Sequence, residues 1–444
     1  MIKHIVMWNV KGDTPDERAQ AIGRLKSAFE SLIGRIPGLL HLEIGVDSSR
    51  VDYACDVVLY SEFDSHESLT QYATHAEHLR VKNELGDMRI ARHQVDYRVV
   101  SADRADAGVD VPGTRTTLAA EADRLGLQRL LVLSTPEQSA LADEVCRLLG
   151  KKAAGTFNGA IMHTPVDVTE RALEVVNVHG VDGIVAVGGG STTGLGKAIA
   201  LRTDLPQMVL PTTYAGSEMT PILGETQDGR KVTQRGAKIQ PEVVIYDVDL
   251  TLSLPPAISA LSAFNAIAHA AEALYAPDGN PIVALMAEEG VRAITDALPR
   301  VMRAPNDADA RGSLLYGAWL CACCLGATTM GLHHKLCHTL GGLFDLPHAQ
   351  THAIVLPYAL AYNAPRIPDA LERLARAMKA ENAIEAIFTL ERECAIPLAL
   401  RDIGMPEPGI AAAVEQAVAN PYANPVAVEA DALGELLTRA WHGQ

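Results

Sequence analysis

The chain has 444 residues, of which 48% are hydrophobic and 21% are charged, which is enough apolar material for two or three domains and excludes global disorder. Its formal net charge of −16 at pH 7 argues against nucleic acid or an anionic membrane as a partner, so an anionic substrate would need a locally basic pocket. The seven unevenly placed cysteines predict reduced thiols. With no signal-peptide pattern and no long apolar run, we expect a cytoplasmic protein without a membrane span.

The first 100 residues predict a self-contained α+β module. Apolar alternation and helical spacing place strands at His4–Val10, Leu40–Val46, Tyr53–Phe63 and His93–Val100, and helices at Asp16–Ile36 and Ser65–Leu85. The resulting order, β-α-β-β-α-β, is typical of a ferredoxin-like fold.

Several stretches of this module resemble the stress-responsive A/B-barrel (Dabb) family. They are the opening KHIVMWNVK with His4, then IPGLLHLEIG, DVVLYSEFDSHESLTQYATHAEH and the closing QVDYRV. The resemblance implies pairwise association into a dimeric barrel, so we expect a homodimer. The side chains that could line a cleft in the module are His4, His75, His78, His93 and Asp96. Scattered histidines near strand ends more often have structural roles, and the sequence identifies no reaction for this module.

Residues 101–116 are small and polar with glycine and proline, and they predict a linker. Residues 117–253 then predict a parallel α/β layer for a dinucleotide. Its expected helices are Leu118–Leu125 and Ser139–Leu149, and its expected strands are Arg129–Leu133, Gly183–Val187, Met208–Leu210 and Val243–Tyr246. Strand signals nearly vanish after Leu254, so residues 254–444 predict an all-α domain.

The stretch DGIVAVGGGSTTGLGKAIA predicts a phosphate-binding turn between a buried strand and a helix. Consecutive glycines at Gly188, Gly189 and Gly190 let the backbone turn sharply and approach a ligand. We expect Ser191 and Thr192 to cap a helix over Leu195–Leu201. A tight turn without a ligand is the alternative.

The second half of the chain contains an unusual set of histidines. Asn265 and His269 are four residues apart on a predicted helix, as are His334 and His338, and His348 precedes His352 by the same interval. So many histidines at helical spacing favour a functional cluster over chance placement in a core. The Cys321-x-x-Cys324 pair, in contrast, lies in an apolar helix without a second pair, and buried thiols are the prediction there.

Four motifs occur in the order found in iron-containing alcohol dehydrogenases: GGGSTTGLGKAIA, LPTTYAGSEMTPI, NAIAHAAEALYA and HHKLCHTLGGLFDLPHAQTHAIVLP. Their variants resemble the maleylacetate reductase branch, and the resemblance covers Leu118 to Gln444. It implies an α/β domain and a helical domain around a cleft, with NADH or NADPH on the glycine turn. Family members begin with extra strands before the helix at Leu118. In this chain either the barrel module or the segment Val109–Val111 takes the place of these strands, or the nucleotide-binding domain lacks them.

The resemblance also implies site residues. Those expected to bind the cofactor, besides Gly188 to Thr192, are Thr212, Thr213, Ser217, Ser134, Thr135 and Lys231. An aspartate and three histidines bind metal in the family, and the matching positions here are Asn265, His269, His334 and His348. Asparagine removes a full negative charge from a cation site, and the usual aspartate of the glycine motif is replaced by Gly194. We therefore expect a metal-free site.

The implied reaction is hydride transfer to the conjugated C=C bond of maleylacetate, giving 3-oxoadipate in the breakdown of aromatic rings of the hydroxyquinol or resorcinol type. Histidine N–H groups of His269, His334 or His338 would stabilise the enolate, with His348 and Asn265 in the same catalytic set. Partners for the two carboxylates are expected among His163, Lys231, His333 and Lys335. Two alternatives stay open: a metal-dependent dehydrogenase acting on a small alcohol or aldehyde, and a protein whose functional centre is the barrel module.

Overall fold

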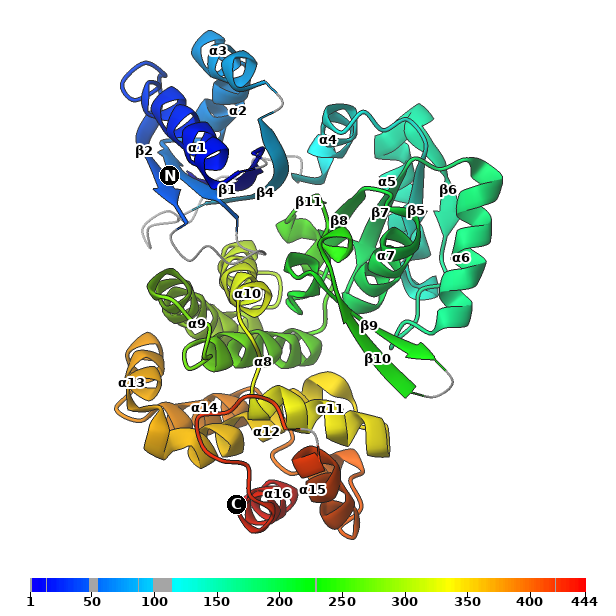
Figure 1. Ribbon diagram of the computed structural model, residues 1–444, viewed down its shortest axis with the longest axis vertical. Coiled ribbons are helices and arrows are strands. Elements are labelled where there is room, and N and C mark those ends of the chain that lie inside the picture. The colour runs from blue at the N-terminus through cyan, green and yellow to red at the C-terminus, as the bar shows by residue number, and fades with distance from the viewer. Residues whose placement is uncertain are drawn as a thin grey trace.

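The protein is described here by a computed structural model. It covers residues 2–12, 14–47, 55–86, 88–98, 114–227, 230–419 and 421–444, with only the backbone for 90–98, 230 and 231. Figure 1 shows an N-terminal α+β module, a central α/β domain and a C-terminal helical domain. The predicted linker lies outside the described residues up to residue 113, and Thr114–Thr117 forms a 3-10 turn. No single described helix is long and apolar enough to cross a membrane; one bent helix pair passes that test by length and composition only.

The N-terminal module confirms the ferredoxin-like prediction. Its elements are β1 (Ile2–Val10), α1 (Pro15–Glu30), β2 (Leu39–Val46), β3 (Val57–Phe63), α2 (His66–Thr74), α3 (Ala76–Leu85) and β4 (Arg89–Arg98). The antiparallel sheet has the order β2-β3-β1-β4. Helix α1 ends earlier than predicted, before Gly34, which takes φ +73°, and Pro37. The second predicted helix is two helices, because His75 has ψ 138°.

The described histidines of this module have structural contacts. The ring Nδ1 of His75 accepts a hydrogen bond of 3.2 Å from the backbone N–H of Glu77 and so caps α3. His4 is buried, and its ring lies edge-on to the rings of Phe63 and Tyr72. The ring Nδ1 of His78 lies 3.2 Å from a backbone carbonyl oxygen of the preceding helix. The side chains of His93 and Asp96 lie outside the described residues.

The central domain is a parallel sheet with helices on both faces. Its elements are α4 (Leu118–Arg124), β5 (Leu130–Leu133), α5 (Ser139–Leu149), β6 (Ala153–Phe157), α6 (Val166–His179), β7 (Gly183–Gly188), α7 (Gly190–Thr203), β8 (Gln207–Pro211) and β11 (Val243–Val244). The sheet order is β11-β8-β7-β5-β6. We did not predict β6, α6 or the hairpin of β9 (Ile222–Gln227) and β10 (Arg230–Arg235). Edge strand β6 is half-buried along its whole length, so its sequence lacks the apolar run of a central strand.

This strand order creates the crevice in which ligands of open α/β sheets bind. The chain leaves β5 for β6 through α5 and returns past β5 to β7 through α6. Helix α5 packs against one face of the sheet and helices α6 and α7 against the other. Because the connections diverge between β5 and β7, the loops that follow these two strands flank a topological switch point. The glycine turn is the loop that follows β7.

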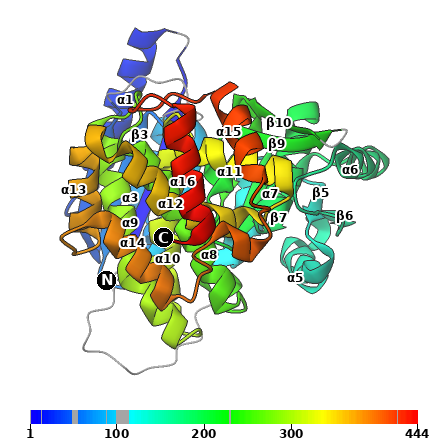
Figure 2. The same ribbon diagram turned by 90° about the horizontal axis from the view of Figure 1, so that it is seen from below.

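The C-terminal domain is helical throughout its described residues, as predicted. Its helices are α8 (Pro256–Ala273), α9 (Pro281–Arg303), α10 (Ala308–Ala327), α11 (Leu332–Phe344), α12 (His348–Asn363), α13 (Pro368–Ala377), α14 (Ala383–Glu393), α15 (Gly409–Ala419) and α16 (Ala430–His442). Helix α8 is buried on every side from Ser259 to Ala273, so it is the central helix. Helix α12 packs against both α8 and α16, and Figure 2 shows α16 in front of the domain when the molecule is seen from below. Cys321 and Cys324 are buried on α10, which confirms their structural interpretation.

The module's sheet lies against the helical domain. Ile5 belongs to the core of that domain, and Met7, Val58 and Tyr60 pack against the same core. Helix α10 lies beside β4, and β4 also lies beside β11, the edge strand of the parallel sheet (Figure 1). The barrel module therefore lies beside this edge of the sheet, whereas the alternative segment, Val109–Val111, lies outside the described residues. The predicted homodimer stays a prediction, and α10 excludes a partner from the part of the sheet face that it covers.

We expect Ile5→Glu to lower the free energy of unfolding by about 2–4 kcal/mol, because a carboxylate would be buried between the sheet and the helices without a partner. The measurement is urea unfolding of the full chain. Leu40→Glu is the matched control, since Leu40 is 60% exposed on the same sheet and should tolerate a charge. Equal stability of the two variants would contradict the packing of this face.

Candidate active site in the interdomain cleft

The glycine turn has the geometry of an anion site. Gly188 takes φ +153°, and a Cβ there would lie 2.4 Å from Thr192 Oγ1. Helix α7 begins at Gly190, and its N-cap, Gly189, makes no side-chain cap hydrogen bond. Our prediction that Ser191 and Thr192 cap the helix was therefore wrong, because both lie inside the first turn. The uncapped N–H groups and the positive end of a 14-residue helix face the switch-point crevice.

Side chains around the turn complete this site. Thr192 Oγ1 is buried and has no hydrogen-bond partner. Thr213 packs against Gly189, where a Cβ would lie 3.0 Å from Thr213 Cγ2. The Thr212 hydroxyl accepts a 3.1 Å hydrogen bond from Gln138 Nε2, a residue that we did not predict. An unsatisfied hydroxyl beside an uncapped helix terminus fits a phosphate, so these residues suit the pyrophosphate of a dinucleotide.

Two other predicted cofactor residues have internal contacts. Ser134 is fully buried, and its hydroxyl hydrogen-bonds with the Thr135 carbonyl oxygen and Asn158 Oδ1, both at 2.9 Å. Ser134 therefore stabilises the loop after β5. Of the two residues, Thr135 is the partly exposed one. The side chain of Lys231 lies outside the described residues.

Lys197, on α7, positions the loop that contains Ser217. Its ammonium group is buried and donates hydrogen bonds to the carbonyl oxygens of Ser217, Thr220 and Ile222, the last two at 2.8 and 2.9 Å. Burial lowers the pKa of Lys197 to about 7, and the nearby Glu218 carboxyl opposes that shift. Lys197 thus joins the phosphate-binding helix to the loop that faces the helical domain.

The departure at Gly194 has a local explanation. A Cβ at Gly194 would lie 2.4 Å from Thr164 Oγ1, so the glycine makes room for Thr164, which takes φ +45°. The adjacent His163 takes φ +67°, and its Nε2 lies 4.0 Å from Asp345 Oδ1 at the end of α11. His163 therefore faces the helical domain from the α/β side. Its contact with a substrate carboxylate stays a prediction.

The predicted histidines come together at the helical side of the cleft, on α8, α11 and α12. The ring centroids of His269 and His334 are 5.2 Å apart, those of His338 and His348 are 6.4 Å apart, and the His333 ring lies 5.1 Å from that of His334. His352 lies between the two groups, 5.0 Å from His334 and 4.2 Å from His348. The sequence places His352 one helical turn after His348 but predicts no role for it.

Glu272, a residue that we did not predict, holds His334. Its carboxylate accepts a 2.6 Å hydrogen bond from His334 Nδ1 and bonds of 2.9 and 2.8 Å from the backbone N–H groups of Gly331 and His333. Burial opposes ionisation of Glu272, but these donors and the neighbouring rings keep its pKa below the usual value. Because Nδ1 carries the proton that Glu272 accepts, His334 Nε2 points into the cluster, buried and without a partner.

Burial sets the protonation of the other rings. It lowers the pKa of His333 to about 4 and, with the surrounding histidines, places those of His269 and His352 well below the ordinary value. These three rings are therefore neutral at pH 7. His333 is fully buried, and its Nε2 lies 2.9 Å from the His352 carbonyl oxygen, which places it behind the cluster.

The loop after β8 brings the two halves of the site together. A Cβ at Gly216, which takes φ +82°, would lie 3.7 Å from His269 Nδ1 and 2.7 Å from Ala322 Cβ. The Asn265 amide nitrogen lies 3.5 Å from the Ala215 carbonyl oxygen. Thr212 and Thr213, at the other end of this loop, contact the glycine turn. A ligand that lies along the loop therefore extends from the phosphate site to the histidines.

Comparison with known proteins agrees with this architecture. The model "Iron-containing alcohol dehydrogenase" matches residues 111–248, the model "Fe-containing alcohol dehydrogenase family, C-terminal" matches residues 259–441, and the "Stress responsive A/B Barrel Domain" matches residues 2–99. The maleylacetate reductase of Burkholderia cepacia is 53% identical over 331 residues, which are 74% of this chain and 94% of the relative. This chain belongs to the iron-containing alcohol dehydrogenase family. It is an oxidoreductase of the maleylacetate reductase type.

Solved structures of relatives have the same fold over most of their length. The crystal structure of maleylacetate reductase from Rhizobium sp. strain MTP-10005 is 54% identical with a TM-score of 0.72. That from Agrobacterium tumefaciens is 53% identical, also with a TM-score of 0.72. Each match covers 74% of this chain and 94% of the other. About a quarter of the chain lies outside these alignments, and the barrel module is a separate family match.

The family implies a metal ion, and the donor atoms can be tested against one. Asn265 Oδ1, His269 Nδ1 and His334 Nε2 are all buried and unpartnered. Ligand atoms of His333, His334 and His352 also lie within 4.8 Å of one another. These neutral donors fit an imidazole-binding divalent ion. Asn265 carries no negative charge, but the Glu272 carboxylate, which accepts a hydrogen bond from His334 Nδ1, supplies one next to these donors. Our expectation of a metal-free site stays a prediction.

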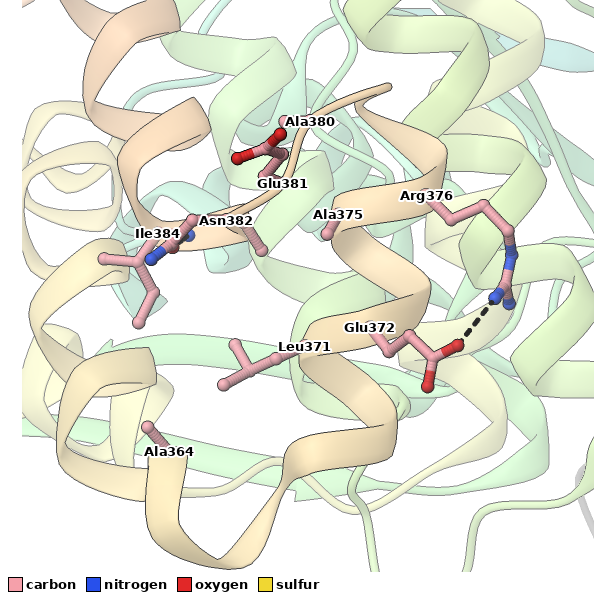
Figure 3. Close-up of a pocket in the computed structure, with 10 residues that line it drawn as sticks. Ala364, Leu371, Glu372, Ala375, Arg376, Ala380, Glu381, Asn382 and Ile384 are labelled. Carbon is pink, nitrogen blue, oxygen red and sulfur yellow. Dashed lines mark hydrogen bonds and ion pairs between the residues drawn. The ribbon is translucent and has the colours of Figure 1, made fainter.

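A hollow of about 600 Å³ lies elsewhere, between α13 and α14 (Figure 3). Leu371, Ala375 and Ile384 contribute its apolar surface. Arg376 on its rim forms ion pairs with Glu372 and Glu288. It contains none of the residues predicted for cofactor or substrate.

We expect Glu272→Gln to lower kcat by about 100-fold or more, because the amide keeps the shape of the side chain but cannot stabilise a protonated His334. The measurement is steady-state kinetics, with circular dichroism as the check that the fold is retained. A variant that folds normally and keeps wild-type kcat would contradict the assigned role of Glu272.

The lowered histidine pKa values predict a loss of stability in acid. Below about pH 6.5 these histidines bind protons in the unfolded chain but stay neutral in the folded protein. The free energy of unfolding therefore falls as the pH falls. His352→Asn removes one such ring, and between pH 6.5 and 5 its unfolding free energy should fall less steeply, by up to about 1.4 kcal/mol per pH unit. Urea unfolding at several pH values measures both slopes. Parallel slopes would show that His352 does not titrate as the structure predicts.

Proposed function

We propose that this protein reduces the conjugated C=C bond of maleylacetate to give 3-oxoadipate, with NADH or NADPH as the reductant. Relatives about half identical over most of their length are maleylacetate reductases, which supports the substrate. The single structural observation that carries the proposal is the Glu272–His334 pair, whose free Nε2 lies in a buried cluster beside the loop from the nucleotide site. That pair can hold and release a proton beside the position that we propose for the substrate carbon that accepts the hydride.

The substrate's electronic structure defines what the residues must do. The nicotinamide, when bound, supplies a hydride to the alkene carbon β to the ketone. The C=C π electrons then move toward the carbonyl, so negative charge develops on the ketone oxygen as an enolate. A fixed hydrogen-bond donor at that oxygen lowers the barrier more than water would. A proton must finally reach the neighbouring carbon.

His334 is the residue best placed to hold that proton. Glu272 stabilises the protonated ring, so Nε2–H can donate to the developing oxyanion while Nδ1–H stays bonded to the carboxylate. The neutral rings of His269 and His352 flank His334 without adding a competing positive charge. Burial of the cluster excludes bulk water and strengthens these interactions.

We propose that the enzyme acts late in the breakdown of aromatic rings of the hydroxyquinol or resorcinol type. At that stage an unsaturated keto-dicarboxylate must be reduced. The names of the relatives support the reaction rather than the pathway. A cytoplasmic location and a homodimer belong to the same proposal.

The test is the loss of reduced-nicotinamide absorbance with freshly generated maleylacetate, using NADH and NADPH in parallel and repeated after exhaustive chelation and metal analysis. We expect rapid oxidation with at least one cofactor, undiminished by chelation. Product analysis should find 3-oxoadipate. An enzyme that oxidises neither cofactor with maleylacetate, under conditions in which it binds NADH, would refute the assignment.

One observation favours a second candidate, a metal-dependent dehydrogenase of a small alcohol or aldehyde. The unpartnered atoms of Asn265, His269 and His334 would hold the ion, and a bound cation would polarise a carbonyl oxygen. Near-stoichiometric iron or zinc, with activity on simple alcohols that chelation removes, would replace our first proposal with this one.

A further inference from the structure

A loop from the C-terminal part of the chain reaches the open side of the histidine cluster. The segment 421–429 connects α15 to α16, and Tyr422 in it is 38% exposed. The Tyr422 hydroxyl lies 3.2 Å from His338 Nδ1, and the Lys335 ammonium lies 5.4 Å from the centroid of the Tyr422 ring. A cation, a phenol and an imidazole from two separate elements therefore meet beside the predicted proton donor.

Internal contacts hold this loop in place. Asn424 and Asn363 exchange two hydrogen bonds between their amide groups, of 2.9 and 2.7 Å, and Asn363 is fully buried on α12. The Tyr362 hydroxyl donates to the Ala427 carbonyl oxygen at 2.7 Å. Tyr422 is thus presented by an anchored loop rather than by a free surface turn, as a pre-organised binding group requires.

Lys335 needs an anion. Among the residues that the structure describes, no carboxylate lies within ion-pair distance of its ammonium group, although the chain carries a net charge of −16. The Lys335 side chain is half-buried, and a desolvated cation without a counter-ion costs free energy. An anionic ligand would remove that cost, and the hydroxyl of Tyr422 would donate a second hydrogen bond to it.

We propose that Lys335 and Tyr422, with His338, form a carboxylate subsite that selects dicarboxylate substrates. This inference rests on the proposed function, because it assigns the second carboxylate of the same substrate. In maleylacetate one carboxylate is separated from the ketone by a single CH₂ group. His338 lies four residues after His334 and three after Lys335 on α11, and the His334 and His338 ring centroids are 6.2 Å apart, so a ketone oxygen at His334 places this carboxylate toward the subsite. Tyr422 is the specificity-determining residue that was not predicted from the sequence.

The experiment compares two substrates: maleylacetate and 4-oxopent-2-enoate, which keeps the conjugated ketone but lacks the distal carboxylate. The readout is the ratio of their kcat/KM values. The ratio should favour maleylacetate strongly in the wild type, fall about 100-fold in Lys335→Met, and fall about 10-fold in Tyr422→Phe, mostly through the KM for maleylacetate. Lys335→Arg, which keeps the charge, should recover part of the preference.

Tyr358→Phe is the matched control, because it removes a tyrosine hydroxyl that has no hydrogen-bond partner among the described residues and whose ring packs against Phe388, outside the subsite and its loop. Its ratio should stay within twofold of wild type. NADH binding, followed by fluorescence, establishes that each variant is folded. A wild type that reduces maleylacetate, with an unchanged ratio in both Lys335→Met and Tyr422→Phe, would overturn this subsite alone. A wild type that reduces neither substrate would overturn the proposed function itself.

Discussion

The buried carboxylate of Glu272 is the group on which the catalytic side of the cleft depends. A buried charge is costly unless it is paired and hydrogen-bonded, and Glu272 meets that requirement with donors from the start of α11. The two backbone N–H groups fix where α11 begins relative to α8, and the ring of His334 is oriented by the same carboxylate. The position of the helix and the tautomer of its histidine are therefore set together.

Two buried basic side chains, Lys197 and Arg311, fix the loop after β8, which joins the nucleotide site to the histidines. Lys197 binds carbonyl oxygens of the loop after β8, and Arg311, fully buried on α10, donates to Tyr214 in that loop and to the Leu254 carbonyl oxygen. Each of these two basic groups donates its hydrogen bonds to neutral oxygen atoms rather than to a carboxylate. The loop between the nucleotide site and the histidines is thus held from both domains, so its backbone at Gly216 can approach His269 closely.

The sequence was informative where a pattern has a short-range cause. Central strands, the glycine turn and the histidine spacings are local, and they were predicted correctly. Helix α7 begins earlier than predicted because β7 ends at Gly188 and Gly189 is the N-cap, with no side-chain cap. Strand β6 was missed because an edge strand lacks an apolar run. Glu272 and Tyr422 were missed for another reason: their roles come from contacts with residues 62 and 84 positions away, which no periodicity encodes.

The covered sheet of the N-terminal module has a consequence during synthesis. The module's last strand ends at Arg98, whereas α10, which covers part of its open face, is complete only at Ala327. At translation rates of about 5–20 residues per second, that face waits roughly 10–50 seconds for its partner within the same chain. During that interval Ile5, Met7 and the other apolar side chains of this face lack the helices that cover them in the complete chain. The N-terminal module must therefore remain folded with an uncovered apolar face until the helical domain has been synthesised.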